Sequence, residues 1–212
     1  MASIENLMIA GCEVHEIQSS HVADSKPPKL WCVGDQSILQ KNLLGIISAR
    51  RFDADLSWKS VQLLQQLGSL ENLAFISGWH SPLEKEAFQV VMGLPASLVI
   101  CVAKSIQRFA PSEEIKIRLK EGRSLLLTHC SPKAKRISRE ASLRRNQLVM
   151  GLAKALLVLS APEESSSLTL AKAALRKGTP VLTPEHPFNR TLLELSATPA
   201  TFESIQSAVE QK

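Results

Sequence analysis

The stretch LLGIIS, residues 43–48, decides the fold, because it is an apolar run without alternating polar positions. A run of this length that is apolar on both faces is typical of a strand covered on both sides of its sheet. Five further runs follow along the chain, and we expect a strand at each of them: NLAFISG at 72–78, SLVICVA at 97–103, SLLLTH at 124–129, ALLVLSA at 155–161 and PVLT at 180–183.

The segments between these runs have the spacing and the end signals of helices. The strongest signal is Ser81-Pro82-Leu83-Glu84, with a capping serine, proline in the first turn and glutamate three residues after the cap. We expect two short helices around Thr198-Pro199 and longer helices over five segments: 53–67, 81–93, 112–121, 138–154 and 165–177. This alternation predicts an α/β fold with a mostly parallel sheet, right-handed crossovers and helices on both faces.

The ligand of such a fold binds beyond the carboxyl ends of the strands, near the point where the strand order reverses. The loops that follow the strands are therefore the first places to look for binding residues. Four of these loops combine apolar residues with basic, imidazole or hydroxyl side chains: 48–52, 77–81, 103–108 and 160–167.

The composition is that of an ordinary globular protein, with 44% hydrophobic and 21% charged residues in a chain of 212. We assign residues 29–212 to one domain and the polar segment 1–28 to an N-terminal arm. No apolar run reaches the ~18–20 residues that cross a bilayer, and the N-terminus does not resemble a secretory signal. We therefore expect a cytoplasmic protein that does not enter a membrane, and the net charge of +5 weakly favours an anionic partner.

The sequence lacks the common patterns of metal and catalytic sites. Its four cysteines are scattered, and only the adjacent His129 and Cys130 come close to a ligand pair. Neither the glycine-rich phosphate-binding motifs nor a G-x-S-x-G nucleophile motif is present. We expect no metal, no cofactor and a binding protein rather than an enzyme.

Two arginines, Arg50 and Arg51, follow the first strand directly. Guanidinium groups at the mouth of a sheet can bind phosphate through two parallel hydrogen bonds. In the alternative interpretation, Arg51 is a solvated surface residue and Arg50 pairs with Asp53 or Asp55. We predict phosphate binding by Arg50 in the first place, and by Arg51 with less support.

A basic stretch precedes and enters the expected helix over 138–154. It is opposed by a single acidic residue, Glu140, and its members are Lys133, Lys135, Arg136, Arg139, Arg144 and Arg145. Helical spacing places Arg145 on the same face as Leu148, so Arg145 should lean inward, whereas Arg144 and Arg136 should face solvent. An inward arginine followed by Asn146 near the mouth of a strand suggests binding, and the alternative for the rest is a solvated basic face.

The turn Ser165-Ser166-Ser167 lies between a strand and a helix. The N–H groups at a helix N-terminus, together with serine hydroxyls, form a natural anion site. Serine is also the commonest capping residue, and Glu163 or Glu164 can occupy the positive helix end. Phosphate binding and plain capping therefore both remain open at this turn.

Aromatic residues make up 4% of the chain, which argues against an extended base-stacking platform. A single stacking contact remains open, with packing in the core as the alternative. The candidates for that contact are Trp31, Trp58, Trp79 and Phe109.

Several motifs resemble, in order and spacing, those of the DNA-processing protein A (DprA/Smf) family. GIISAR at 45–50 is similar to the family's strand ending in G-S-R, and SGWHSPLEKEAF at 77–88 is similar to S-G-x-A-x-G-I-D-x-x-A-H. The clearest match is RNQLVMGL at 145–152 with R-N-R-I-I-x-G-L, followed by SSSLTLA at 165–171 where the family has S-G-S-L-I-T-A. The resemblance covers about residues 30–184.

This resemblance implies a Rossmann-like three-layer α/β sandwich and a bacterial protein that binds single-stranded DNA during DNA processing and recombination. By position, the basic pocket of the family would use Arg50, Arg145, Asn146 and the turn Ser165–Ser167, assisted by Arg51 and the basic stretch. A recombinase and a second copy of the chain are the further partners that it implies. The alternatives are a nucleotide or small phosphorylated ligand in the same pocket, or a protein-interaction module.

Overall fold

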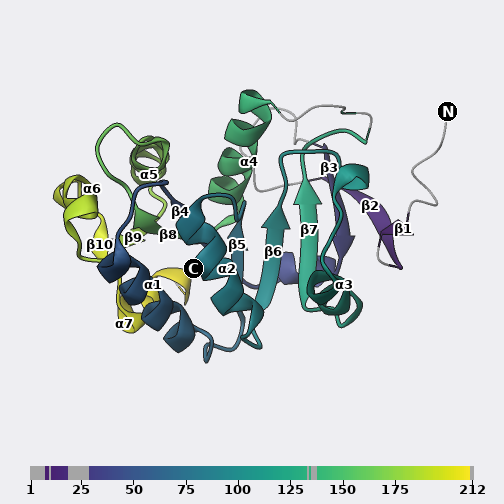
Figure 1. Ribbon diagram of the computed structural model, residues 1–212, viewed down its shortest axis with the longest axis horizontal. Helices are drawn as coiled ribbons and strands as arrows, with labels where there is room; N and C mark the ends of the chain where they lie inside the picture. Colours follow the sequence, from purple (N-terminus) through teal and green to yellow (C-terminus); the bar gives the residue numbers. More distant parts are fainter. Residues whose placement is uncertain (1–7, 10, 19–28, 133, 135–137, 211–212) are drawn as a thin grey trace.

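The computed structural model describes residues 8–9, 11–18, 29–132, 134 and 138–210 (Figure 1). Within these residues ten strands form one sheet in the order β1-β2-β3-β7-β6-β5-β4-β8-β9-β10. The strands are β1 Met8–Ile9, β2 Cys12–Gln18, β3 Lys29–Gly34, β4 Asn42–Ser48, β5 Leu73–Ser77, β6 Ser97–Cys101, β7 Ser124–Thr128, β8 Ala155–Ser160, β9 Val181–Thr183 and β10 Thr198–Pro199. The helices are α1 Ala54–Leu67, α2 Pro82–Met92, α3 Glu113–Lys120, α4 Arg139–Leu152, α5 Ser166–Arg176, α6 Arg190–Glu194 and α7 Phe202–Glu210, with short 3-10 turns η2 Gln36–Gln40, η3 Ile106–Arg108 and η4 Pro187–Asn189.

The α/β architecture predicted from the apolar runs is confirmed. Each run forms a strand, β4 to β9, and these six strands are parallel to one another. One core cluster joins the sheet to residues of α1, α2, α3 and α7, and a second cluster joins its other face to α4, α5 and α6. The molecule is therefore a three-layer sandwich with helices on both faces.

The order of the strands reverses between β4 and β8. From β4 the chain moves through β5 and β6 to β7 on one side, and it then returns past β4 to build β8 and β9 on the other side. Loops that leave β4 and β8 therefore diverge to opposite faces, and α/β folds bind ligands in the crevice between such loops. The carboxyl ends of the parallel strands point to the upper rim of the view in Figure 1.

The N-terminal segment departs from the expectation of an arm. Residues 12–18 form β2, which pairs antiparallel with β3, and β3 pairs antiparallel with β7. The run at 29–34 was not expected to be a strand, although four of its six residues are buried. These strands extend the sheet beyond β7, so the described part of residues 1–28 belongs to the same sheet as the rest of the domain.

A buried arginine holds the end of α2 against α3. The Arg118 side chain donates to the backbone carbonyls of Met92 (3.2 Å), Leu94 (3.1 Å) and Ala96, and its Nε donates to the Ser124 hydroxyl (3.3 Å). Arg118 is 3% exposed. Its charge lies at the negative end of α2, so the helix dipole and the carbonyls together replace a carboxylate partner.

The substitution Arg118→Met should lower the free energy of unfolding by about 3 kcal/mol, because three backbone carbonyls at the end of α2 lose the buried donor that they share. Urea unfolding of the variant and the wild type measures this difference. Arg123→Met is the control, since Arg123 pairs with Glu121 near the surface, and its effect should stay below about 1 kcal/mol. Equal effects of the two substitutions would contradict the anchoring role of Arg118.

Candidate functional site

The loop after β4 is fastened to the end of β8 at the point where the strand order reverses. The backbone N–H of Ala49 donates to the Ser160 carbonyl (2.8 Å), and the Ser160 hydroxyl donates to the Arg51 carbonyl. Arg50 and Arg51 are both exposed at this mouth. The backbone of the two arginines is therefore fixed, while their charged ends reach into solvent.

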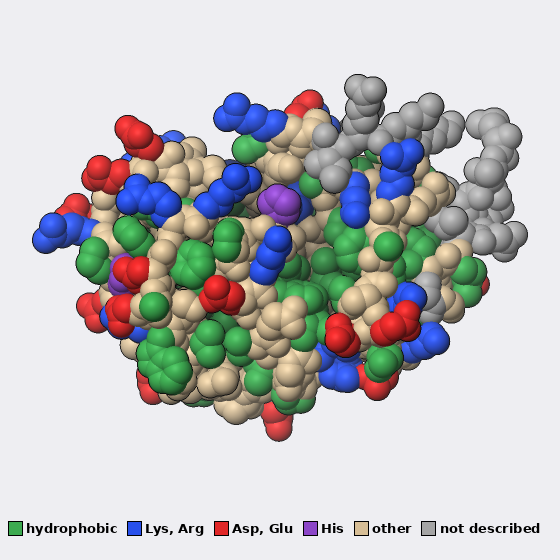
Figure 2. All heavy atoms as spheres, viewed as in Figure 1, with side chains coloured by type: hydrophobic (Ala, Val, Ile, Leu, Met, Phe, Trp, Pro, Cys, Tyr) green, Lys and Arg blue, Asp and Glu red, His purple; other side chains and the backbone are tan. Residues whose placement is uncertain are grey.

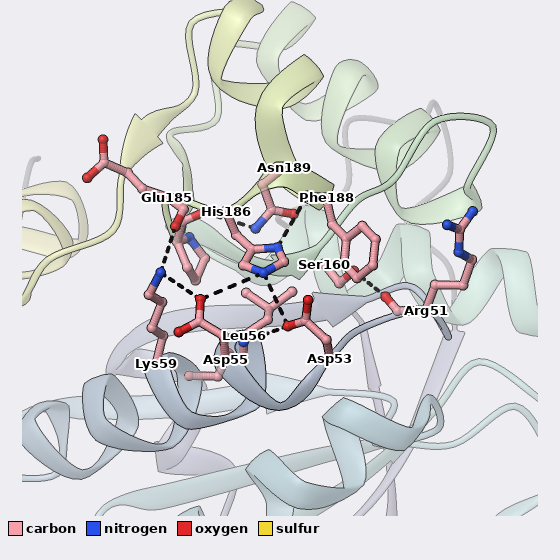
Figure 3. A network of polar contacts seen from close by, with 12 residues as sticks. Arg51, Asp53, Asp55, Leu56, Lys59, Ser160, Glu185, His186, Phe188 and Asn189 are labelled. Atoms are coloured by element: carbon pink, nitrogen blue, oxygen red, sulfur yellow. Dashed lines mark hydrogen bonds and ion pairs between the residues drawn. The ribbon is translucent and has the colours of Figure 1, made fainter.

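The carboxylates that follow these arginines in the chain are bound to other groups (Figure 3). Asp53 Oδ1 lies 3.1 Å from His186 Nε2 and accepts from the Leu56 N–H (3.0 Å), and Asp55 Oδ2 lies 2.8 Å from Lys59 Nζ. The alternative pairing of Arg50 with Asp53 or Asp55 is therefore wrong. Among the described residues no carboxylate forms an ion pair with Arg50 or Arg51.

The loop after β5 is built around the buried carboxylate of Glu84. Ser81 and Glu84 form the predicted capping box of α2. The Glu84 carboxylate also accepts from the backbone N–H groups of Ser48 (2.9 Å) and His80 (2.7 Å), which joins the end of β4 to this loop. The Glu84 carboxylate is thus held by backbone N–H groups, and it forms no ion pair with an arginine of the described residues.

Arg145 leans inward as predicted and is 8% exposed. Its Nε and Nη2 donate to Asn146 Oδ1 (3.1 and 2.8 Å). The guanidinium lies against Gly78, where an added Cβ would be 2.5 Å from Arg145 Cζ. No carboxylate of the described part of the chain pairs with Arg145, so this buried cation is held by one amide oxygen and by close packing on a glycine.

The N-terminus of α5 combines both roles that the sequence left open. Ser165 caps the helix by accepting from the Leu168 N–H (3.1 Å), and the Ser167 hydroxyl donates to the Ser160 carbonyl (2.8 Å). Ser166 is exposed at the first helical position. The backbone N–H groups of Ser166 and Ser167 have no acceptor within the described residues, so capping leaves two donors for an anion.

The basic stretch is only partly described by the structure. Lys133, Lys135 and Arg136 lie outside the described residues. Arg139 is exposed at the first turn of α4, and Arg144 is exposed and paired with Glu140 (2.7 Å). The outward direction predicted for Arg144 is confirmed.

Three further residues stand at the ends of β5, β6 and β7, and no role had been assigned to them from the sequence. They are His80, Lys104 and His129, each within three residues of a strand end. Lys104 Nζ lies 5.2 Å from the centre of the Phe109 ring. Lys104 and the arginines form a basic edge beside the two histidines, and Figure 2 shows Lys and Arg side chains along this upper rim. Their position directly after apolar runs was the signal that could have identified them.

For two of the four candidate aromatic side chains, the structure agrees with the alternative of packing in the core. Trp31 and Trp79 are buried in the core, and Trp58 is 64% exposed on α1. Trp58 borders a groove of about 480 Å³ between α1 and α7, on the helical face and not among the basic loops. The aromatic ring nearest to Arg51 is Phe188, at a distance of 5.5 Å from Cζ to the ring centre, and the sequence had not indicated it.

Two residues beside this edge have left-handed backbones that are rare for side chains of their size. They are Trp79 after β5 (φ 52°) and Glu164 after β8 (φ 62°). Trp79 is held there by its indole N–H, which donates to the Val99 carbonyl (3.2 Å). Strain of this kind concentrates where loops must present binding groups.

No group of three or more His, Cys, Asp or Glu is placed to hold a metal ion within the described residues. In the same residues no helix is long and apolar enough to cross a membrane. The cationic and N–H groups at the carboxyl edge thus point to an anionic ligand.

The sequence profile of the family described as DNA recombination-mediator protein A matches residues 15–202. The chain belongs to the DNA recombination-mediator protein A family. The matched residues include all the parallel strands, β4 to β10, and the loops that carry Arg50 and Ser166. A search of curated protein sequences finds no match.

Solved structures support the fold of this family member. DNA processing protein A from Helicobacter pylori, described for its mode of single-stranded DNA binding, is 20% identical with a TM-score of 0.73, and the match covers 95% of this chain and 96% of that one. DprA from Streptococcus pneumoniae is 17% identical with a TM-score of 0.76, covering 91% and 70%. A molybdenum cofactor binding protein from Rippkaea orientalis is 13% identical with a TM-score of 0.53, covering 80% and 96%.

The titration of His129 should make this family member less stable in acid. Burial, and then the charges of Arg144 and Arg145, lower the pKa of His129 below its ordinary 6.5. Below that ordinary pKa the unfolded chain binds a proton that the folded chain does not, so stability falls as the pH falls. In denaturant unfolding at about pH 7.5 and about pH 5.5, His129→Gln should lose less stability on acidification than the wild type. An equal loss in both proteins would contradict this assignment.

Proposed function

We propose that this protein binds single-stranded DNA without chemical conversion, holding the phosphates at the basic edge beyond the carboxyl ends of β4 to β8. The observation that carries the proposal is the buried guanidinium of Arg145, which has no carboxylate partner within the described residues. A buried cation without a counter-ion is unfavourable, and an anionic ligand relieves this. Membership of the DNA recombination-mediator protein A family supports DNA as the source of that anion.

Two groups of donors on the edge can bind successive phosphates. Arg50 and the N–H groups of Ser166 and Ser167 lie on the β4 and β8 side, where the strand order reverses. Arg145, supported by Asn146, lies over the loop after β5. Contacts of this kind position a nucleic acid through its backbone and carry no base sequence. Binding should therefore be insensitive to sequence and sensitive to salt.

The family also motivates the wider role that we propose, in DNA processing and recombination in a bacterial cytoplasm. A recombinase and a second copy of the chain are the proposed protein partners. We propose that residues 29–212 act as one DNA-binding domain, with β1 and β2 as an extension of its sheet. Lys133, Lys135, Arg136 and Arg139 are proposed to add charge to the same DNA track.

Fluorescence anisotropy with a labelled single strand of about 30 nucleotides tests the proposal directly. The double substitution Arg50→Ala with Arg145→Ala should weaken binding by about tenfold or more at low salt. It should also reduce the slope of log K against log salt by about 1.4, because each phosphate contact to a single strand contributes about 0.7 to that slope.

The matched control removes two exposed charges from the opposite edge, Arg176→Ala with Lys177→Ala, just before β9. This control should bind DNA with the affinity of the wild type. Failure of the wild type to bind at low salt would overturn the proposal. If nucleoside phosphates raise the melting temperature instead, the pocket binds a small phosphorylated ligand.

A separate prediction concerns the contact between Gly78 and Arg145. The Gly78 backbone is not left-handed, so Gly78→Ala is tolerated once the Arg145 side chain moves away. The variant should lose only about 1 kcal/mol of stability, yet its affinity for single-stranded DNA should fall to that of Arg145→Ala. The double variant should bind like Arg145→Ala alone, because both changes remove the same contact.

Anisotropy titrations of the three variants give this comparison. Gly93→Ala serves as the control, since a Cβ at Gly93 would meet only the Val90 carbonyl at 3.4 Å. Additive losses in the double variant would show that Gly78 does not act through Arg145.

A further inference from the structure

The Arg51 guanidinium lies over an aromatic ring at the mouth of the crevice. Its Cζ lies over the Phe188 ring, 5.5 Å from the ring centre, and its carbonyl accepts from the buried Ser160 hydroxyl (Figure 3). The backbone and the guanidinium are thus both restrained, although Arg51 is exposed. A long side chain at the surface normally samples many rotamers, and this one rests against an aromatic face.

The Phe188 ring is fixed by the segment after β9. Its backbone N–H donates to His186 Nδ1 (3.2 Å), and the two rings lie 5.1 Å apart at an angle of 54°. The His186 side chain is 5% exposed, and its Nε2 lies 3.1 Å from Asp53 Oδ1. The backbone that carries the Phe188 ring is therefore joined, through His186, to the start of α1.

The next residue, Asn189, completes this support. Its buried amide donates to the carbonyls of Leu159 (3.0 Å) and Pro184 (3.0 Å) and accepts from the Ala161 N–H (2.8 Å). The loop after β9 is thereby joined to the end of β8. The aromatic face beneath Arg51 belongs to the rigid frame of the crevice.

The electrostatic surroundings leave the Arg51 guanidinium available. Asp53 and Asp55, the carboxylates close by in the chain, are bound to His186 and Lys59. A planar cation with an aromatic ring behind it and solvent in front presents a flat surface. Nucleobases stack on guanidinium planes and on aromatic rings.

We infer that Arg51, backed by Phe188, forms a nucleobase-stacking subsite beside the phosphate-binding loop. This inference rests on the proposed binding of single-stranded DNA and adds a base contact to its phosphate contacts. The subsite accepts any base, because every base has a π-face. It gives a role to Arg51 that a lysine, with the same charge but no planar group, does not reproduce.

The experiment compares two labelled strands of equal length, one of thymidines and one with abasic sites throughout, by anisotropy at fixed salt. For the wild type, the ratio of the abasic Kd to the thymidine Kd measures the contribution of the bases. Arg51→Lys and Phe188→Leu should each reduce this ratio by about fivefold or more. Phe188→Tyr keeps the ring and should retain the ratio, whereas Arg50→Ala should weaken binding to both strands equally.

The outcomes distinguish the proposed DNA binding from the proposed stacking subsite. If the wild type binds neither strand, the proposed function fails. If the wild type binds and Arg51→Lys has the wild-type ratio, the stacking subsite is refuted while DNA binding stands. Should Phe188→Leu fail to fold, as judged by thermal unfolding, the pair Arg51→Lys and Phe188→Tyr decides the question.

Discussion

The carboxylates of Asp53, Asp55 and Glu84 are bound to partners other than the arginines, and the basic edge depends on this arrangement. Glu84 accepts from backbone N–H groups of two loops, Asp53 from the first turn of α1 and from His186, and Asp55 pairs with Lys59. These carboxylates hold the loops together through hydrogen bonds and ion pairs. None of them forms an ion pair with Arg50, Arg51 or Arg145. The guanidinium groups at the same edge are therefore left for a ligand, which is the condition for anion binding.

The same interactions make the site rigid. The end of β4 is joined to the loop after β5 through Glu84, and to the end of β8 through Ser160. Asn189 and His186 add the loop after β9 to this frame. The left-handed Trp79 and Glu164 occur in two of these loops, where strain of order 1–3 kcal/mol per residue is offset by the surrounding hydrogen bonds.

One difference from the family motifs and one retained glycine have a physical explanation in the structure. Ser166 stands where the motif has glycine, and it occupies the first turn of α5 without a left-handed backbone, so a side chain is accommodated there. Gly78 retains the motif residue, and a Cβ at that position would collide with Arg145. Glycine at position 78 leaves room for the Arg145 guanidinium against the backbone. At position 166, where α5 begins, a serine side chain fits.

Apolar runs and capping signals by themselves determined the six parallel strands, the helices between them and the inward direction of Arg145. The spacing of apolar residues is a property of a single segment. The run LLGIIS at 43–48 therefore predicts a buried strand without reference to other parts of the chain. The pairing of β2 with β3, the partners of Asp53 and the approach of Phe188 to Arg51 were decided only by the tertiary structure. The last two join residues far apart in the chain, His186 being 133 positions from Asp53. Such contacts depend on the order of strands in the sheet, and no local pattern around either residue contains that order.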